Sequence, residues 1–150
     1  RRFVPPKRLK PMLSMITIIF LATLMTLVMS IVPGAYKLFT SGLDEKLKTD
    51  ANLQQLKGWG KFAQRAFENH LETYVSFMGL AVLAVYLGDR VGVDDVMRQA
   101  ILGGWIYLIF RVAHFLCFTL SVPYLRTASW FGSVFGIVLI GWSVFQLAGF

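Results

Sequence analysis

Three groups of ionisable and hydrogen-bonding residues interrupt an otherwise apolar sequence. In the first group, Arg65, Asn69 and Glu72 are spaced at i, i+4 and i+7 and therefore share one face of a helix. Glu68 lies on the same side. A guanidinium binds a carboxylate through two parallel hydrogen bonds, and a carboxylate can accept an ammonium. This face therefore suits a small zwitterion that carries carboxylates.

The other two groups lie nearer the C-terminus. Arg111, His114 and Phe118 follow the spacing i, i+3 and i+7, again one helical face, and Arg126 and Thr127 open the last apolar stretch. A charge inside an apolar span costs about 2.5–3.5 kcal/mol on insertion scales, so such residues usually face the interior of a bundle. Any one of them could be a headgroup anchor or a structural ion pair. Three aligned groups favour a shared binding site.

The composition defines the medium in which these residues lie. The chain has 150 residues, of which 56% are hydrophobic and 15% charged, whereas a soluble domain has about 25% charged residues. A single cysteine excludes a disulfide scaffold, and the high aromatic content excludes disorder. We therefore expect a membrane protein.

Two stretches predict transmembrane helices. The first, at about 12–32, has no charge, and the second, at about 126–149, has Arg126 as its only charge. The first would be about 31 Å long as a helix, enough to cross a hydrocarbon core of roughly 30 Å. Two further apolar segments, at about 62–87 and 99–121, contain the ionisable residues. We predict an all-α membrane protein in which residues 1–150 form a single domain of four transmembrane helices.

The expected helix ends place the three polar groups together. Pro33-Gly34 is expected to end the first helix, before a polar loop at about 41–58. Residues 88–92 are expected to form a tight second loop, and Pro123 to close the third helix. In such an up-and-down bundle, the start of the second helix, the end of the third and the start of the fourth share one membrane side.

Basic residues are divided almost equally between the two sides of this bundle, so the positive-inside rule does not decide its orientation. The identity of the membrane is likewise left open. The net charge of +7 indicates contact with anionic lipid headgroups. No nucleic-acid-binding motif accompanies it, and no His or Cys pair has metal-ligand spacing. We expect neither a nucleic acid nor a metal as partner.

Three motifs resemble the MAPEG family, the membrane-associated proteins of eicosanoid and glutathione metabolism. The run RAFENHLET (65–73) is similar to the signature of that family's second helix. The run RVAH (111–114) is similar to the third helix of the microsomal prostaglandin E synthase and glutathione transferase branch, and PYLRTASW (123–130) resembles the start of the fourth helix.

The resemblance implies a homotrimer that holds glutathione between neighbouring protomers. Arg126 would lie near the sulfur, with the Thr127 hydroxyl as a second donor. A guanidinium in a low-dielectric site lowers the pKa of a thiol and so favours the reactive thiolate. A lipophilic electrophile would enter from the bilayer. The residues implied as glutathione ligands are Arg65, Asn69, Glu72, Arg111, His114 and Arg126.

The resemblance thus implies a glutathione-dependent transferase, peroxidase or isomerase. Phe118 stands where many members have Tyr, and Glu68 stands where the prostaglandin synthase branch has Arg. These departures favour an alternative, a non-catalytic lipid-binding scaffold or an accessory subunit of a larger membrane complex. Ion or proton translocation along Glu72, His114 and Arg111 is a third hypothesis, but these groups gather toward one surface.

The remaining features indicate packing. Gly132-x-x-x-Gly136 and Gly103-Gly104 are expected to let helices approach closely. His70 points away from the face that carries Arg65 and Asn69, so we do not expect it to bind the ligand.

Overall fold

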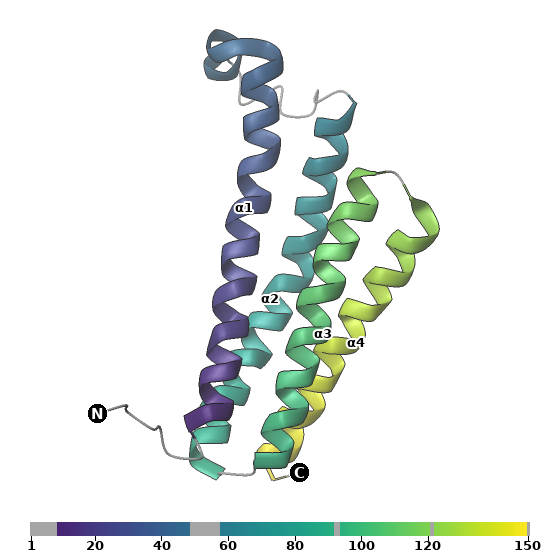
Figure 1. The fold of residues 1–150 in the computed structure, drawn as a ribbon. Coiled ribbons are helices and arrows are strands. Elements are labelled where there is room, and N and C mark those ends of the chain that lie inside the picture. The colour runs from purple at the N-terminus through teal and green to yellow at the C-terminus, as the bar shows by residue number, and fades with distance from the viewer. Residues whose placement is uncertain (1–8, 49–57, 92–93, 121, 150) are drawn as a thin grey trace, which may run out of the picture.

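A computed structural model describes residues 9–48, 58–91, 94–120 and 122–149. In these ranges the chain forms four helices and no strand: α1 (Leu9–Lys48), α2 (Trp59–Val91), α3 (Asp94–Thr119) and α4 (Pro123–Leu147). The helices lie side by side in an up-and-down bundle (Figure 1). All four are long and apolar enough to cross a membrane. The prediction of an all-α, multi-pass membrane protein is confirmed.

The bundle also has the predicted direction of its helices. The start of α2, the end of α3 and the start of α4 lie at the same end of the molecule, which is the upper end in Figure 1. The three sequence groups with ionisable residues therefore lie toward one end of the bundle.

The first helix is longer than expected, and the prediction that Pro33-Gly34 ends it is wrong. α1 continues through Pro33 to Lys48, so the helix covers much of the expected loop; residues 49–57 lie outside the described ranges. A membrane helix tolerates proline because contacts with its neighbours offset the lost hydrogen bond. Here Tyr36, beyond the proline, packs its ring against Trp59 of α2, with centroids 5.5 Å apart.

Two further boundaries differ from the sequence prediction. α2 runs through Gly88-Asp89 to Val91 instead of turning there. Pro123 does not close α3, which ends at Thr119, but begins α4. The first position of a helix suits proline, because the N–H that proline lacks has no intrahelical partner there.

Glycines bring α3 into close contact with its neighbours, as predicted. A Cβ on Gly136 of α4 would lie 2.6 Å from the Gly103 carbonyl oxygen and 2.7 Å from the Tyr107 backbone nitrogen. On another side of α3, a Cβ on Gly104 would lie 3.1 Å from Ile18 of α1. The backbones of α3 and α4 therefore touch, which holds the two helices close together.

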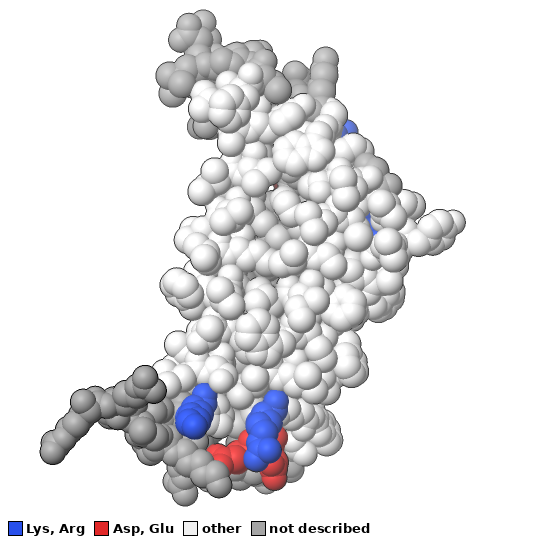
Figure 2. Space-filling view, viewed as in Figure 1, with Lys and Arg blue, Asp and Glu red and all other residues white. Residues whose placement is uncertain are grey.

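Apolar side chains point outward along all four helices, including Phe20, Ile31, Val75, Ile109 and Phe131. Figure 2 shows the consequence on one face, where a broad uncharged band covers the middle and most visible charged side chains gather at the lower end. This distribution matches a protein whose central band faces acyl chains.

Candidate functional site

Arg111 connects α3 to α2. Its side chain is only 1% exposed. The Nη1 atom donates to the Asn69 Oδ1 atom over 3.2 Å and to the Asn69 carbonyl oxygen over 3.5 Å. Glu72 is close enough for a favourable electrostatic interaction with Arg111, but among the described residues Arg111 forms no ion pair. The guanidinium is thus buried as a cation whose described partner is neutral.

His114 connects α3 to the start of α4. It is 4% exposed, and its Nδ1 atom lies 3.0 Å from the Arg126 carbonyl oxygen. A carbonyl oxygen only accepts hydrogen bonds, so Nδ1 carries the proton and donates it. The same carbonyl accepts from the Ser129 hydroxyl over 2.9 Å. The Nε2 atom is buried and has no partner in the described part of the chain.

The Arg126 side chain lies over an aromatic ring. Its Cζ atom is 4.9 Å from the centroid of Phe118, a distance typical of cation–π contacts. Phe118 in turn meets His114 edge-on, with centroids 5.8 Å apart. This contact holds the guanidinium of Arg126 at the end of the bundle where α3 and α4 meet.

His114, Phe118 and Arg126 line one side of an open cavity of about 340 Å³ between α2, α3 and α4. Its volume lies at the lower end of the range for small-molecule sites, about 300–1,000 Å³. Thr127 at its edge is exposed, and its hydroxyl donates to the Pro123 carbonyl oxygen over 3.2 Å. The lining residues are Asn69, His114, Phe118, Arg126, Thr127 and Trp130.

The structure brings together most, though not all, of the residues predicted from sequence. Asn69, His114, Arg126 and Thr127 line the cavity, and Arg111 is buried against Asn69. Two predicted ligands are elsewhere: Arg65 and Glu72 are exposed on α2 and do not line it.

Glu68 is exposed on α2 as well, where it accepts a hydrogen bond from the Gln64 Nε2 atom over 2.9 Å. Together with Arg65 and Glu72 it forms a charged strip along the outer surface of α2. In the described part of the chain, no ion pair neutralises any of these three residues. The strip lies on a helix that is long and apolar enough to span the membrane.

Two contacts between α1 and α2 were not expected from sequence. The Thr26 hydroxyl lies 2.8 Å from the Nε2 atom of His70, and the Thr23 hydroxyl lies 2.8 Å from the Tyr74 hydroxyl. His70 is 1% exposed. It faces α1, in agreement with the prediction that it points away from the face of Arg65. The only sequence signal for these pairs is that two threonines one turn apart interrupt an apolar span.

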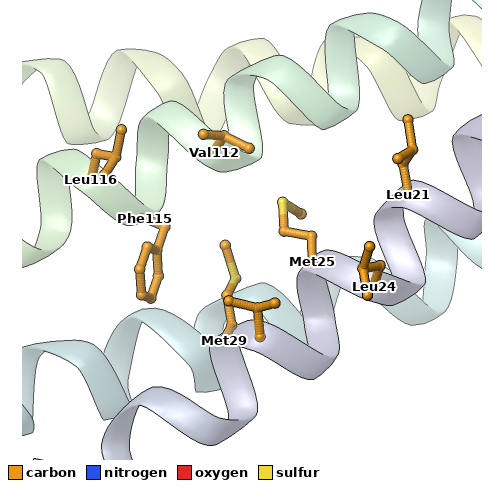
Figure 3. A pocket seen from close by; sticks show the side chains of 8 residues that line it. Leu21, Leu24, Met25, Met29, Val112, Phe115 and Leu116 are labelled. Carbon is orange, nitrogen blue, oxygen red and sulfur yellow. The ribbon is translucent and has the colours of Figure 1, made fainter.

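A second cavity, of about 310 Å³, lies between α1 and α3 and is entirely apolar in its side chains. Figure 3 shows side chains of both helices directed into the space between them. Several residues at its rim are exposed, so the cavity opens to the bilayer. Its lining residues are Leu21, Leu24, Met25, Val28, Met29, Val112, Phe115 and Leu116.

The polar cavity has the donors that a peptide with several carboxylates requires. The guanidinium of Arg126 is at its surface, and the Nε2 atom of His114, which also lines it, is buried without a partner in the described structure. Buried polar atoms are normally hydrogen-bonded, so this atom favours a polar ligand. The residues present therefore fit glutathione. In the same ranges, no group of three or more His, Cys, Asp or Glu is placed to hold a metal ion.

One comparison with known proteins identifies the family of the chain. The family model described as MAPEG family matches residues 15–146, which include parts of all four helices and every residue that lines the polar cavity. Comparison with curated proteins and with solved structures gave no match. Because the family model covers most of the sequence, the chain belongs to the MAPEG family.

Proposed function

We propose that this protein is a glutathione-dependent transferase, peroxidase or isomerase that acts on a lipophilic electrophile within the membrane. The observation that carries the proposal is the cavity in which Asn69, His114 and Arg126 meet from three helices. The family assignment supports the same activity. By its RVAH motif at 111–114, we place the chain nearest to the prostaglandin E synthase and glutathione transferase branch.

Arg126 is the residue that stabilises negative charge at the reacting end of the site. When bound, glutathione supplies a thiol whose anionic form is the nucleophile. The Arg126 guanidinium is half-buried above the Phe118 ring, where water screens its charge less than at an open surface. Thr127 lies beside it and can turn its hydroxyl from the Pro123 carbonyl toward the ligand.

The remaining cavity residues hold the peptide part of the ligand. The Asn69 amide offers a donor and an acceptor to peptide groups, and it is itself oriented by the hydrogen bond from Arg111. The His114 Nε2 atom has a free hydrogen-bonding position. Arg111 supplies positive charge just behind this wall, which favours carboxylates over neutral ligands.

The charged strip on α2 favours self-association. Charged groups that face acyl chains are costly, and such residues usually face the interior of an assembly. Arg65 carries a positive charge and Glu68 and Glu72 negative charges, so copies of the strip can pair with one another. We propose that a homotrimer buries the strip and brings Arg65 and Glu72 to a glutathione molecule between protomers.

The second substrate reaches the protein through the lipid. The outward-facing apolar side chains make acyl chains the surrounding medium, and the apolar cavity between α1 and α3 offers a hollow for a hydrocarbon tail. Its side chains provide no donor or acceptor, so it selects for hydrophobicity and shape alone.

Calorimetry of glutathione binding to the detergent-purified protein tests the proposal. We expect binding by the wild type and a loss of affinity of about 10- to 100-fold in Arg126→Ala, because the hydrogen bonds lost involve charged groups. Arg98→Ala is the matched control: Arg98 is an exposed arginine of α3 that pairs with Asp95, far from the cavity. The absence of binding heat in the wild type would reject the proposal.

A second candidate function is a non-catalytic scaffold or accessory subunit of a larger membrane complex. Phe118 favours this function. Arg126 contacts only the face of its ring, whereas a tyrosine at this position would also supply a hydroxyl. Conjugation of glutathione to a generic electrophile separates the two functions. Binding with turnover supports the enzyme, whereas binding without turnover supports the scaffold.

A further inference from the structure

A layer of buried polar atoms lies on the inner side of the candidate site. Buried polar groups in proteins are nearly always hydrogen-bonded, to protein or to water. Within the described ranges, however, five buried side-chain atoms have no protein partner, and all belong to α2 or α3. They are His70 Nδ1, Tyr107 Oη, Arg111 Nε, Arg111 Nη2 and His114 Nε2.

The hydrogen bonds of Thr26 show that His70 needs a second partner in either tautomer. The Thr26 hydroxyl lies 2.8 Å from both the Ala22 carbonyl oxygen and the His70 Nε2 atom, and it has only one proton. If that proton goes to Ala22, Nε2 is protonated and Nδ1 is an acceptor without a donor. If it goes to His70, Nδ1 is protonated and is a donor without an acceptor.

Arg111 and Tyr107 border the same layer from α3. Arg111 donates hydrogen bonds to Asn69, the residue next to His70. It is also near enough to His70 to interact with it electrostatically. Its Cζ atom is 5.8 Å from the centroid of the Tyr107 ring. Thr73 comes near the Tyr107 hydroxyl. Its own hydroxyl donates to the His70 carbonyl over 3.1 Å, so it could only accept from Tyr107. In the described ranges the Tyr107 hydroxyl forms no hydrogen bond.

We propose that internal water molecules bind between His70, Tyr107 and Arg111, and that His70 positions Arg111 through them. Arg111 only donates, whereas His70 and Tyr107 can each donate or accept. Water serves all three because it does both, and internal waters make about three hydrogen bonds. An anion could accept from Arg111 but could not donate to an unprotonated Nδ1 of His70. The bond to Thr26 anchors His70 to α1 and so fixes one side of this layer.

The water site can be tested directly because the sequence contains only two histidines. Protein labelled with ¹⁵N-histidine is studied in lipid bilayers by solid-state nuclear magnetic resonance, with magnetisation transferred from water to the rings. We expect transfer to His70, despite its 1% exposure and its place in a membrane-spanning helix. His114, which lines the polar cavity, is the positive control. Absence of transfer to His70 would overturn the water site.

The positioning role rests on the proposed function and is tested by glutathione affinity. We expect His70→Phe to weaken binding by about three- to tenfold, as loss of one net hydrogen bond would. His70→Gln, which keeps an amide donor and acceptor, should restore most of the affinity. Rescue by glutamine would not be expected if the ring served only as packing. Wild-type affinity in His70→Phe would overturn the positioning role.

A second pair of variants does not alter His70 itself. Thr26→Val removes the hydroxyl that anchors the histidine, and Thr17→Val is its control, because the Thr17 hydroxyl is exposed and bonds only to the Leu13 carbonyl. We expect weaker glutathione binding in the first variant alone; equal affinities would overturn the role of the anchor. If the wild type binds no glutathione, the proposed function fails, while the water-transfer experiment still decides the water site.

Discussion

The two cavities of this bundle lie on different faces of α3 and have similar volumes, about 340 and 310 Å³, but opposite chemistry. Toward α2 and α4, α3 presents Arg111, His114 and Phe118. Toward α1 it presents Val112, Phe115 and Leu116. Successive side chains of an α-helix are rotated by about 100° about its axis, so Val112 and Phe115 lie on a different face from Arg111 and His114.

One helix therefore separates a polar cavity that contains a guanidinium from an apolar cavity. Arg111 and His114 are each held by a partner from the neighbouring helix, so their orientation is fixed before a ligand binds. The side chains of the apolar cavity, with Met25 and Met29 among them, have only packing contacts and can adapt in shape. We therefore expect a specific site on one side of α3 and a permissive one on the other.

The largest effect is expected where the contact of α3 with α4 is broken. A Cβ in Gly136→Ala would meet the backbone of α3, which cannot rotate away, so the two helices must separate. We expect a loss of about 1–3 kcal/mol in the free energy of unfolding, measured in mixed detergent, together with loss of glutathione binding. Gly79→Ala is the control, since its Cβ would have open space. Equal stability of the two variants would contradict the packing described.

The next effect separates stability from binding. Arg111→Met replaces a buried cation that has no described ion pair. Burial of a charge without an ion pair is itself costly, which offsets the loss of the hydrogen bonds to Asn69. We therefore expect unfolding stability to be kept while glutathione affinity falls by about 10- to 100-fold. Unfolding curves and calorimetry on the same preparation check both. Unchanged affinity would remove Arg111 from the polar site.

A smaller effect is expected from adding one hydroxyl on each side of α3. Phe118→Tyr adds it beside Arg126, and we expect a gain of about two- to tenfold in affinity or turnover, the value of one net hydrogen bond. Phe115→Tyr adds the same group to the apolar cavity and should give no gain. The ratio of the two measured gains reports how far the two cavities differ in their preference for polar groups. Equal gains would refute that difference.

The smallest effect on glutathione is expected from filling the apolar cavity. In Leu116→Trp the larger ring occupies the hollow between α1 and α3. We expect glutathione affinity to stay within about twofold, because this side chain is on another face of α3 from the polar cavity. The KM for a long-chain lipophilic electrophile should rise. Steady-state kinetics with both substrates varied gives the two constants, and a matching rise in KM for glutathione would show that the cavities are not separate.

The existence and order of the four helices could be predicted from the sequence because they depend on long apolar runs. The residues at which the helices end could not. Pro33 normally signals the end of a helix, yet α1 continues through it, and Tyr36 beyond it contacts Trp59 of α2, a contact that no local pattern encodes. Pro123 is equally ambiguous, since the same residue suits the end of one helix and the start of the next. Such positions are decided by packing between segments distant in sequence.

The site was predictable to the extent that it follows helical spacing. Spacing placed Arg111 and His114 on one face; in the structure His114 lines the polar cavity and Arg111 is buried against Asn69, which also lines it. Spacing also grouped Arg65 and Glu72 with Asn69, whereas only Asn69 faces the cavity of the single chain. The rotation of α2 about its own axis decides which of these side chains faces the cavity, and the bond of His70 to Thr26 is one contact that orients α2.

Trapping of glutathione at Thr127 tests the shared polar cavity most directly. Thr127→Cys, in a Cys117→Ser background, places a thiol at the edge of the cavity, and exchange with oxidised glutathione gives a mixed disulfide that intact mass spectrometry detects. Tyr124→Cys is the control, one turn away and exposed on the same helix. We expect glutathionylation at position 127 to be faster by at least about tenfold, and this advantage to be abolished by adding Arg111→Met. Equal rates at the two positions would show that glutathione does not bind in the polar cavity.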